Sequence, residues 1–126
     1  MTDKPAGRAP ALFDEALFAE DLRRAGDTGR KVALAARSNY ERGGVPLDEL
    51  LACEEEGPEG TALASCMKVY LPRPAGKFGM VFRIALREGK ALLVYAAFGV
   101  RHHPRDSHAP TVYEIAHRRL AAKTLS

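Results

Sequence analysis

The spacing of hydrophobic residues changes from a helical period to a strand period near the middle of the chain. In the first half, apolar residues recur every three or four positions, as they do on one face of a helix. This spacing predicts helices over residues 12–25 and 30–42 and a short third helix that begins at Pro46. Gly26 and the Gly43–Gly44 pair are expected to end the first two helices, because glycine is favoured just after a helix.

In the second half, apolar and polar positions alternate, which is typical of strands with one buried face. The alternation predicts strands over residues 67–71 and 78–87, and an almost wholly apolar run predicts a central strand over residues 91–99. A tight turn at residues 88–90 joins the last two strands into a hairpin. Helical spacing returns over about residues 110–123.

This order of elements predicts an α+β fold, with N-terminal helices packed on a three- to four-stranded antiparallel sheet and a closing C-terminal helix. Residues 1–10 are polar and hold two prolines and a glycine, so they are expected to form a flexible tail. Residues 11–126 then form a single domain, since 126 residues is an ordinary domain length. The helices are expected to bury Phe78, Phe82 and Ile84 on one face of the sheet.

Composition narrows the class of protein. Hydrophobic residues make up 46% and charged residues 28%, which excludes a wholly disordered or collagen-like chain. No apolar run approaches the roughly 20 residues of a membrane helix, and the first residues hold no apolar segment of the secretory type. Two cysteines, Cys53 and Cys66, are too few for a disulfide framework. We therefore expect a cytoplasmic protein with reduced thiols and no membrane partner.

The charges are divided unevenly between the two halves of the chain. Residues 1–65 hold 8 Lys/Arg and 13 Asp/Glu, whereas residues 66–126 hold 11 Lys/Arg and 3 Asp/Glu. On the second face of the predicted sheet, the alternation gathers Lys68, Tyr70 and Arg83, with Arg87 beyond them. Cations interleaved with an aromatic side chain favour RNA binding. Two alternatives stay open: the acidic half neutralises the basic half, and the cations are those of any half-exposed sheet.

The densest group of reactive side chains follows the last predicted strand. Histidine titrates near neutral pH, so it suits the acid and base steps of RNA cleavage, while arginine stabilises the charged transition state. The group contains Arg101, His102, His103, Arg105, His108, Tyr113 and His117. Three alternatives stay open: a metal site of three of the histidines, ordinary surface residues, and a Cys–His nucleophile pair that uses Cys53 or Cys66.

The order of motifs in the second half is similar to that of the RelE/ParE superfamily of bacterial type II toxins. The resemblance covers about residues 66–121: a strand ending in Lys-Val-Tyr-Leu, a long hairpin, Arg101, and a closing V-Y-x-x-A-x-x-R segment that begins at Val112. It implies an enzyme that cuts mRNA in the ribosomal A site without a metal, and a cognate antitoxin that covers the basic face. The related ParE branch acts on DNA gyrase. The family usually has a strand before its helices, which residues 1–11 do not resemble.

The resemblance also implies roles for particular residues. Arg101 matches an arginine that contacts the scissile phosphate, Tyr113 a tyrosine at the cleavage site, and Lys68 a lysine of the catalytic face. Histidines near the end of the last strand act as acid or base in other members, and His102 and His103 fall there. This chain differs from the family pattern where Gly79 replaces an arginine and Tyr70 replaces a second lysine, and its loop before Tyr113 is longer.

We therefore expect a toxin of a type II toxin–antitoxin system, an endoribonuclease that cleaves ribosome-bound mRNA by metal-independent acid–base chemistry. Its partners would be a cognate antitoxin, the ribosome and mRNA, and it would need no cofactor or metal. The expected catalytic residues are Arg101, His102, His103 and Tyr113. The expected RNA-binding residues are Lys68, Tyr70, Lys77, Arg83 and Arg105. The alternative is a non-enzymatic protein, either a ParE-like gyrase-binding toxin or a nucleic-acid or protein interaction module.

Overall fold

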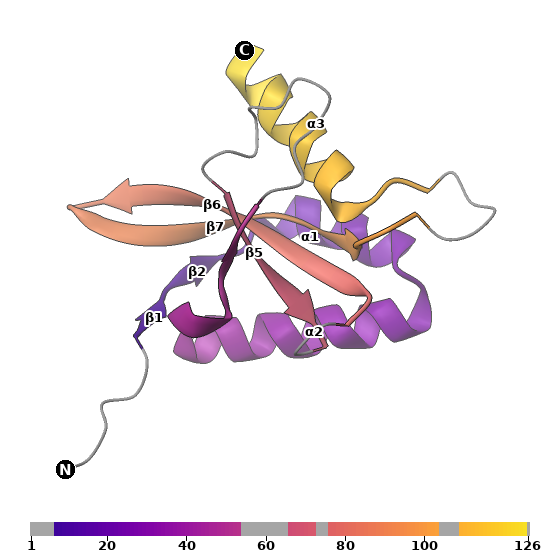
Figure 1. The fold of residues 1–126 in the computed structure, drawn as a ribbon, viewed down its shortest axis with the longest axis horizontal. Helices are drawn as coiled ribbons and strands as arrows, with labels where there is room; N and C mark the ends of the chain where they lie inside the picture. The colour runs from indigo at the N-terminus through magenta and orange to yellow at the C-terminus, as the bar shows by residue number, and fades with distance from the viewer. Residues whose placement is uncertain (1–6, 54–65, 73–75, 104–108, 126) are drawn as a thin grey trace.

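The fold was analysed in a computed structural model that describes residues 7–53, 66–72, 76–103 and 109–125. Within these ranges the chain is α+β, and Figure 1 shows its helices and strands. The helices are α1 (Glu15–Arg24), α2 (Gly26–Gly43) and α3 (Val112–Leu125), with a 3₁₀ turn η1 (Leu47–Glu49). The longer strands are β5 (Cys66–Leu71), β6 (Phe78–Arg87) and β7 (Lys90–Val100). The two-residue strands are β1 (Arg8–Ala9), β2 (Ala11–Leu12), β3 (Val45–Pro46) and β4 (Leu51–Ala52).

The main sheet has five strands in the order β2-β7-β6-β5-β4. Its three long strands form the predicted antiparallel meander, in which Tyr70 lies opposite Gly79 and Gly79 lies opposite Gly99. The short edge strands β4 and β2 extend it, β4 antiparallel to β5 and β2 parallel to β7. The sheet therefore has more strands than the predicted three to four, because the prediction did not include the short edge strands β2 and β4.

The segment before the first helix contributes strands as well. Arg8–Ala9 pairs with Val45–Pro46 in a separate two-stranded sheet, and Ala11–Leu12 pairs in parallel with Leu93–Val94 of β7. The expectation that residues 1–10 form a tail was therefore wrong from Arg8 onward, and residues 1–6 lie outside the described part. Strands of two residues carry no alternation to read, and Pro10 between them suggested a loop.

The first two helices confirm the helical spacing, with shifted ends. The side chain of Asp14 caps α1 by accepting a hydrogen bond from the N–H of Leu17. Gly26 has a φ of +72°, and its left-handed backbone lets α2 start directly after α1. The third helix predicted from Pro46 was wrong: it is the single 3₁₀ turn η1, after which the chain extends into β4.

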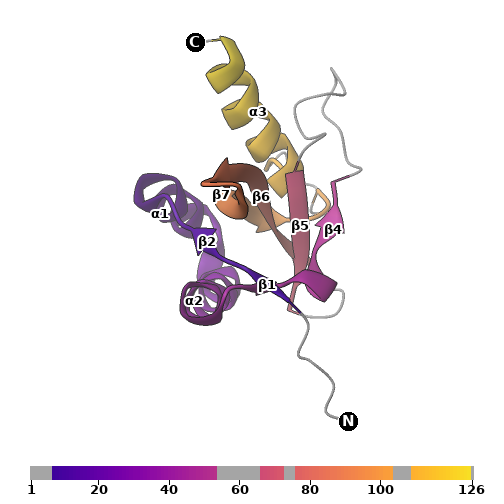
Figure 2. The same cartoon turned by 90° about the vertical axis from the view of Figure 1, so that its left-hand side faces the viewer.

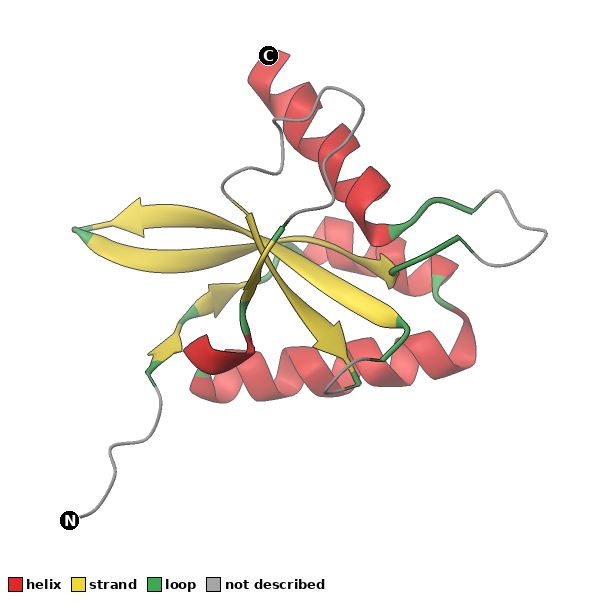
Figure 3. Ribbon diagram, in the orientation of Figure 1, coloured by secondary structure: helices red, strands yellow, loops and turns green. Residues whose placement is uncertain are grey.

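The hairpin β6–β7 turns at Glu88–Gly89, whose φ angles of 54° and 77° fit a tight two-residue turn. β5 pairs with β6 only as far as Arg83, so the tip of the hairpin projects beyond the rest of the sheet (Figure 3). Ile84 is 43% exposed there, which corrects the expectation that the helices bury it. The helices cover the part of the hairpin that pairs with β5, and they do not extend over its tip.

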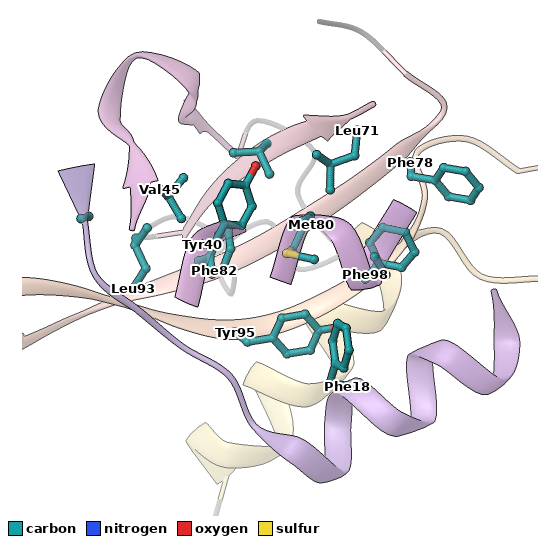
Figure 4. Close-up of a cluster of buried hydrophobic side chains, with 14 residues drawn as sticks. Phe18, Tyr40, Val45, Leu71, Phe78, Met80, Phe82, Leu93, Tyr95 and Phe98 are labelled. Carbon is teal, nitrogen blue, oxygen red and sulfur yellow. The ribbon is translucent and has the colours of Figure 1, made fainter. Parts of the chain in front are cut away.

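The larger hydrophobic core lies between the sheet and the two N-terminal helices. Phe78, Phe82 and Tyr95 are buried on this face against Phe18 and Tyr40 of the helices. The rings of Phe18 and Tyr95 meet edge to face with centroids 5.4 Å apart, as Figure 4 shows. Close contacts among large rings in a dry core give this layer much of its stability.

α3 covers part of the opposite face of the sheet, so the fold has three layers there (Figure 2). Ile115 and Ala116 of α3 are buried against Val81, Ala96 and Ala97 of the sheet. Between Val81 and Phe82 the register of β6 against β7 slips by one residue, which leaves Ala96 as a bulge. No described helix is both long enough and apolar enough to span a membrane.

A buried ion pair closes the free edge of β7 next to this bulge. Asp21 of α1 is 1% exposed, and its carboxylate accepts hydrogen bonds from the Phe98 N–H at 3.0 Å and from Arg119 of α3 at 2.8 Å. Arg119 also donates to the carbonyl of Ala96 at 2.6 Å. β2 pairs with β7 only at Leu93–Val94, so these side chains satisfy backbone groups that no described strand reaches. The pair thereby ties α1 and α3 to the same strand.

Candidate functional site

Four of the predicted site residues meet on the α3 side of the sheet. Lys68 and Tyr70 come from β5, Arg101 follows directly after β7, and Tyr113 lies in the first turn of α3. Their side chains form a chain of contacts in which each cation lies against at least one aromatic ring. We call these four residues the cation–aromatic cluster. Arg101, Tyr70 and Tyr113 thus lie together on one side of the sheet, although Lys68 and Tyr113 are buried.

Arg101 is held in one orientation by three contacts. Its guanidinium carbon lies 3.5 Å from the centroid of the Tyr70 ring, which is close stacking. One terminal nitrogen donates to the carbonyl of Gly76 at 2.8 Å, and the backbone N–H donates to the carbonyl of Lys77 at 2.9 Å. The residue is half-buried, so a part of its side chain reaches the surface. A guanidinium fixed in this way is preorganised for an anion.

Lys68 lies deeper than the sequence suggested. It is only 3% exposed, and its ammonium nitrogen is 5.2 Å from the ring centroid of Tyr70 and 5.2 Å from that of Tyr113. The expected direct contact of Lys68 with RNA phosphate therefore does not fit this conformation. A buried ammonium between two rings instead sets their separation and contributes positive potential beneath the surface.

Gly79 makes room for the cation–aromatic cluster. A Cβ atom at this position would lie 3.3 Å from Cγ of Arg101, 3.3 Å from Cγ1 of Val112 and 3.6 Å from the hydroxyl of Tyr113. These contacts leave no room for a longer side chain. Gly79 therefore creates the space that Arg101 and Tyr113 occupy, and Arg101 supplies a cation beside it.

The start of α3 is fixed by a reciprocal cap. The N–H of Thr111 donates to the carboxylate of Glu114 at 2.9 Å, and the N–H of Glu114 donates to the Thr111 hydroxyl at 3.3 Å. Thr111 is followed by Val112, which is 0% exposed, and by Tyr113, which is 6% exposed. The cap thus holds the turn that carries Tyr113 against the sheet.

His103 joins this cap from the other side. Its Nε2 lies 2.9 Å from the Glu114 carboxylate and its Nδ1 lies 3.0 Å from the carbonyl of Ala109. Both neighbours are acceptors, so both hydrogen bonds form together only when the ring is doubly protonated. The pKa of Glu114 is lowered, chiefly by the hydrogen bond from the Thr111 backbone and also by His103. His103 thus links the loop after β7 to the cap of α3.

The remaining predicted residues do not join the cluster. His102 is exposed and Lys77 is exposed with its ammonium 5.3 Å from the Phe78 ring, whereas Arg83 is half-buried on β6 opposite Cys66. His117 is half-buried in α3. Arg105 and His108 lie outside the described residues. The Lys77 side chain is therefore exposed and the Arg83 side chain half-buried, and no ring contact that involves either of them includes a cluster residue in the described part of the chain.

The metal site of three histidines would include His108, which lies outside the described residues, whereas both cysteines of the Cys–His alternative are described. No three His, Cys, Asp or Glu side chains of the described residues lie close enough to hold a metal ion. Burial raises the pKa of the Cys66 thiol to about 11, partly opposed by the charge of Arg83, so the reactive thiolate is scarce near neutral pH. Cys53 is buried as well. Neither thiol is presented as a nucleophile.

Two features of the site differ from what the sequence analysis expected or included. Tyr70 was expected to face RNA, but its ring is the platform on which Arg101 rests. Glu114 was not singled out, although the spacing of Thr111 and Glu114 is that of a capping box. That spacing was the available signal, and it was overlooked beside the histidines.

Sequence and structure comparisons give no relative from which to transfer a function: no family model, curated protein or solved structure matches this chain.

Proposed function

We propose that this protein is a RelE-like toxin, an endoribonuclease that acts on ribosome-bound mRNA. The observation that carries the proposal is the cation–aromatic cluster, in which Arg101 is stacked on Tyr70 and fixed by the Gly76 carbonyl. A preorganised guanidinium on a basic half of the chain suits a phosphate that gains charge during cleavage.

The proposed reaction is attack of the ribose 2′-oxygen on the adjacent phosphorus, with loss of the 5′-oxygen of the next nucleotide. The products are a 2′,3′-cyclic phosphate and a 5′-hydroxyl. Arg101 stabilises the charge on the phosphate oxygens, and His103, when its ring turns away from Glu114 and the Ala109 carbonyl, donates a proton to the leaving 5′-oxygen. The acceptor of the 2′-hydroxyl proton is assigned to His102, which is exposed on the same loop.

Lys68 and Tyr113 have supporting roles in this proposal. Both are buried, so we assign them to positioning: Tyr113 packs under Arg101 beside Gly79, and Lys68 lies between the Tyr70 and Tyr113 rings. Their burial also favours a second candidate function, binding of RNA or of a protein target without cleavage. A gyrase-binding toxin belongs to this second class.

The topology adds independent support. The resemblance implies a strand before the helices, and β2 occupies that place, parallel to β7 at the edge of the main sheet. The order of the remaining elements, two helices, a meander, an arginine and a closing helix, is the order that the resemblance implies. A cognate antitoxin remains part of the proposal as the partner that neutralises the protein.

The proposal is tested with Arg101→Ala, which removes the guanidinium from the surface of the cluster. The purified protein is added to translating ribosomes on a defined mRNA, and 5′-hydroxyl ends are mapped. We expect cleavage by the unchanged protein and a loss of about 100-fold or more for Arg101→Ala, since one fixed transition-state donor contributes this much. The control is Arg23→Ala, which removes an exposed arginine from α1 and should cleave at the normal rate.

Two substitutions of Tyr70 distinguish, in the same assay, the effect of ring stacking on Arg101 from the effect of an apolar side chain alone. Tyr70→Phe keeps the ring beneath Arg101 and should retain most of the activity, whereas Tyr70→Leu should lower it. If mRNA stays intact and translation continues with the unchanged protein, the enzymatic proposal fails. DNA damage on induction, with intact mRNA, would instead favour the gyrase-binding alternative.

A further inference from the structure

The two cysteines of the chain lie opposite each other on neighbouring strands. β4 and β5 pair in antiparallel register with Ala52 opposite Met67, so the next step of the same register places Cys53 opposite Cys66. The N–H of Cys53 donates to the carbonyl of Cys66 at 3.2 Å, which shows that the alignment continues to this pair. Figure 2 shows the two strands side by side. Opposite residues of an antiparallel pair direct their side chains to the same face of the sheet.

Both thiols lie in the apolar layer between the sheet and α3. Cys53 is 8% exposed and Cys66 is 2% exposed, and both belong to the hydrophobic cluster that also contains Val81 and Tyr113. Cys66 lies two residues before Lys68 on β5, so these two side chains take the same face. The cysteine pair is therefore next to the cation–aromatic cluster and is separate from it.

The alignment of the backbone fits a disulfide. Opposite residues that share a backbone hydrogen bond have Cα atoms about 5.5 Å apart, and disulfide-bonded residues most often have Cα atoms about 5.5–6 Å apart. Their Cβ atoms need to approach from about 4.5–5.5 Å to about 3.5–4.5 Å. β4 is a strand of two residues at the end of the sheet, so a shift of this size disturbs few described contacts.

We propose that Cys53 and Cys66 form a reversible disulfide that fastens β4 to β5 in the presence of a small-molecule disulfide such as oxidised glutathione. The thiolate of Cys53, the more exposed of the two, attacks one sulfur of the oxidant and displaces a glutathione thiolate. The thiolate of Cys66 then attacks the Cys53 sulfur and displaces the second glutathione. The two thiol protons reach the departing glutathione thiolates through water. Two protein thiols are thereby oxidised, and one glutathione disulfide is reduced to two thiols.

The reaction is slow in the folded protein, because burial raises the pKa of the Cys66 thiol to about 11 and leaves little thiolate. The structure holds both cysteines in the thiol form, which is the form that starts this exchange. The inference goes beyond the proposed nuclease function and does not depend on it, because neither cysteine takes part in the proposed cleavage.

The test incubates the folded full-length protein with oxidised glutathione, without denaturant, and follows its mass. We expect a product lighter by the mass of two hydrogen atoms, and a dithiol reductant should restore the starting mass. A glutamate-specific protease cuts between the two cysteines at residues 54–56, and the two fragments should stay joined until reduction. Backbone hydrogen exchange at residues 51–53 should slow by about tenfold or more in the oxidised protein, because the bond prevents β4 from leaving β5.

The matched control is Leu51→Cys/Cys53→Ser, which moves one thiol by two residues along the same face of β4. Position 51 lies diagonal to Cys66, at a Cβ separation of about 7–8 Å, so this variant should take up glutathione without forming the internal bond. Leu51 is 43% exposed, so the variant should fold, and circular dichroism checks this.

Three results would overturn the proposal. The first is a glutathione adduct that persists on the unchanged protein, or a disulfide between two molecules, in place of the internal bond. The second is an internal bond that forms equally fast in the shifted variant, since chance contact in an opened chain would then explain it. The third is equal hydrogen exchange at residues 51–53 in the oxidised and reduced protein.

Discussion

Replacement of Asp21 by alanine tests whether the buried ion pair at the edge of β7 holds the layers of the fold together. Asp21 is almost fully buried, and its carboxylate accepts hydrogen bonds from the hydroxyl of Tyr95, the N–H of Phe98 and the guanidinium of Arg119. Burial alone would lower the pKa of Arg119, but the hydrogen bond and charge of Asp21 raise it above the ordinary value. Arg119 therefore stays charged while it lies against the Asp21 carboxylate.

The magnitude follows from what Asp21→Ala leaves behind. The Arg119 side chain is only 15% exposed, so its charge would stay largely buried with the more exposed Glu20 as a partner at 3.2 Å. Removing one partner of a buried ion pair costs about 3–5 kcal/mol of stability. This cost includes the hydrogen bonds that the neighbouring donors lose. A domain of ordinary stability, about 5–15 kcal/mol, would lose a large part of it.

Urea unfolding followed by circular dichroism measures this loss. We expect a lower free energy of unfolding by about 3–5 kcal/mol for Asp21→Ala, and a coupling energy above about 1 kcal/mol in a cycle with Arg119→Met. The control is Asp27→Asn, since Asp27 has 96% of its side chain exposed and contacts Arg30 at 3.4 Å. It should change stability by less than about 0.5 kcal/mol. A loss below about 1 kcal/mol for Asp21→Ala, or no coupling, would refute the reasoning.

Two further predictions concern titration. Burial raises the pKa of the Cys66 thiol from 9.0 to about 11, so at pH 8 the folded protein should react with a disulfide reagent much more slowly than the unfolded protein. The stability contributed by the protonated thiol should fall as the pH rises from 9 to 11. Equal reaction rates of the folded and unfolded protein would contradict this prediction. Glu114 has a lowered pKa, so its cap stabilises α3 above its ordinary value of 4.5 and is lost as the pH falls through the lowered value. Glu114→Ala should cost about 1 kcal/mol at pH 7 and little when unfolding is measured in strong acid; a cost independent of pH would exclude this role.

The long elements were predictable because their periods are long enough to read. Residues 78–87 alternate over ten positions, and β6 spans Phe78–Arg87 as predicted. The short strands were not predictable, since two residues carry no period and β2 depends on a parallel partner far along the sequence. The exposure of Ile84 was also missed, because alternation shows which face a residue takes but not how far a helix extends over that face.

For the candidate site, the sequence could place some of the predicted residues together but could not show how deeply they are buried. Alternation placed Lys68 and Tyr70 on one face, and β5 and α3 bring them to Arg101 and Tyr113. Burial of Lys68 follows from α3, which packs over the same face, and no local pattern in β5 reports that neighbour. The histidines were predicted as a group, yet within the described residues His103 alone is seen bonded to the cap of α3.

The residues of the closing V-Y-x-x-A-x-x-R segment mainly hold α3 against the sheet. Val112 packs where Gly79 and Gly99 leave space, and Ala116 is 0% exposed, so its small side chain lets α3 approach the sheet. Arg119, one helical turn beyond Ala116, reaches the edge of β7 and pairs with Asp21. Tyr113 is the residue of this segment that belongs to the cation–aromatic cluster, through its contact with Lys68. The segment therefore specifies how α3 docks, whereas the proposed activity would depend on Arg101 outside it, and substitutions at Val112, Ala116 or Arg119 should lower stability before they alter the proposed chemistry.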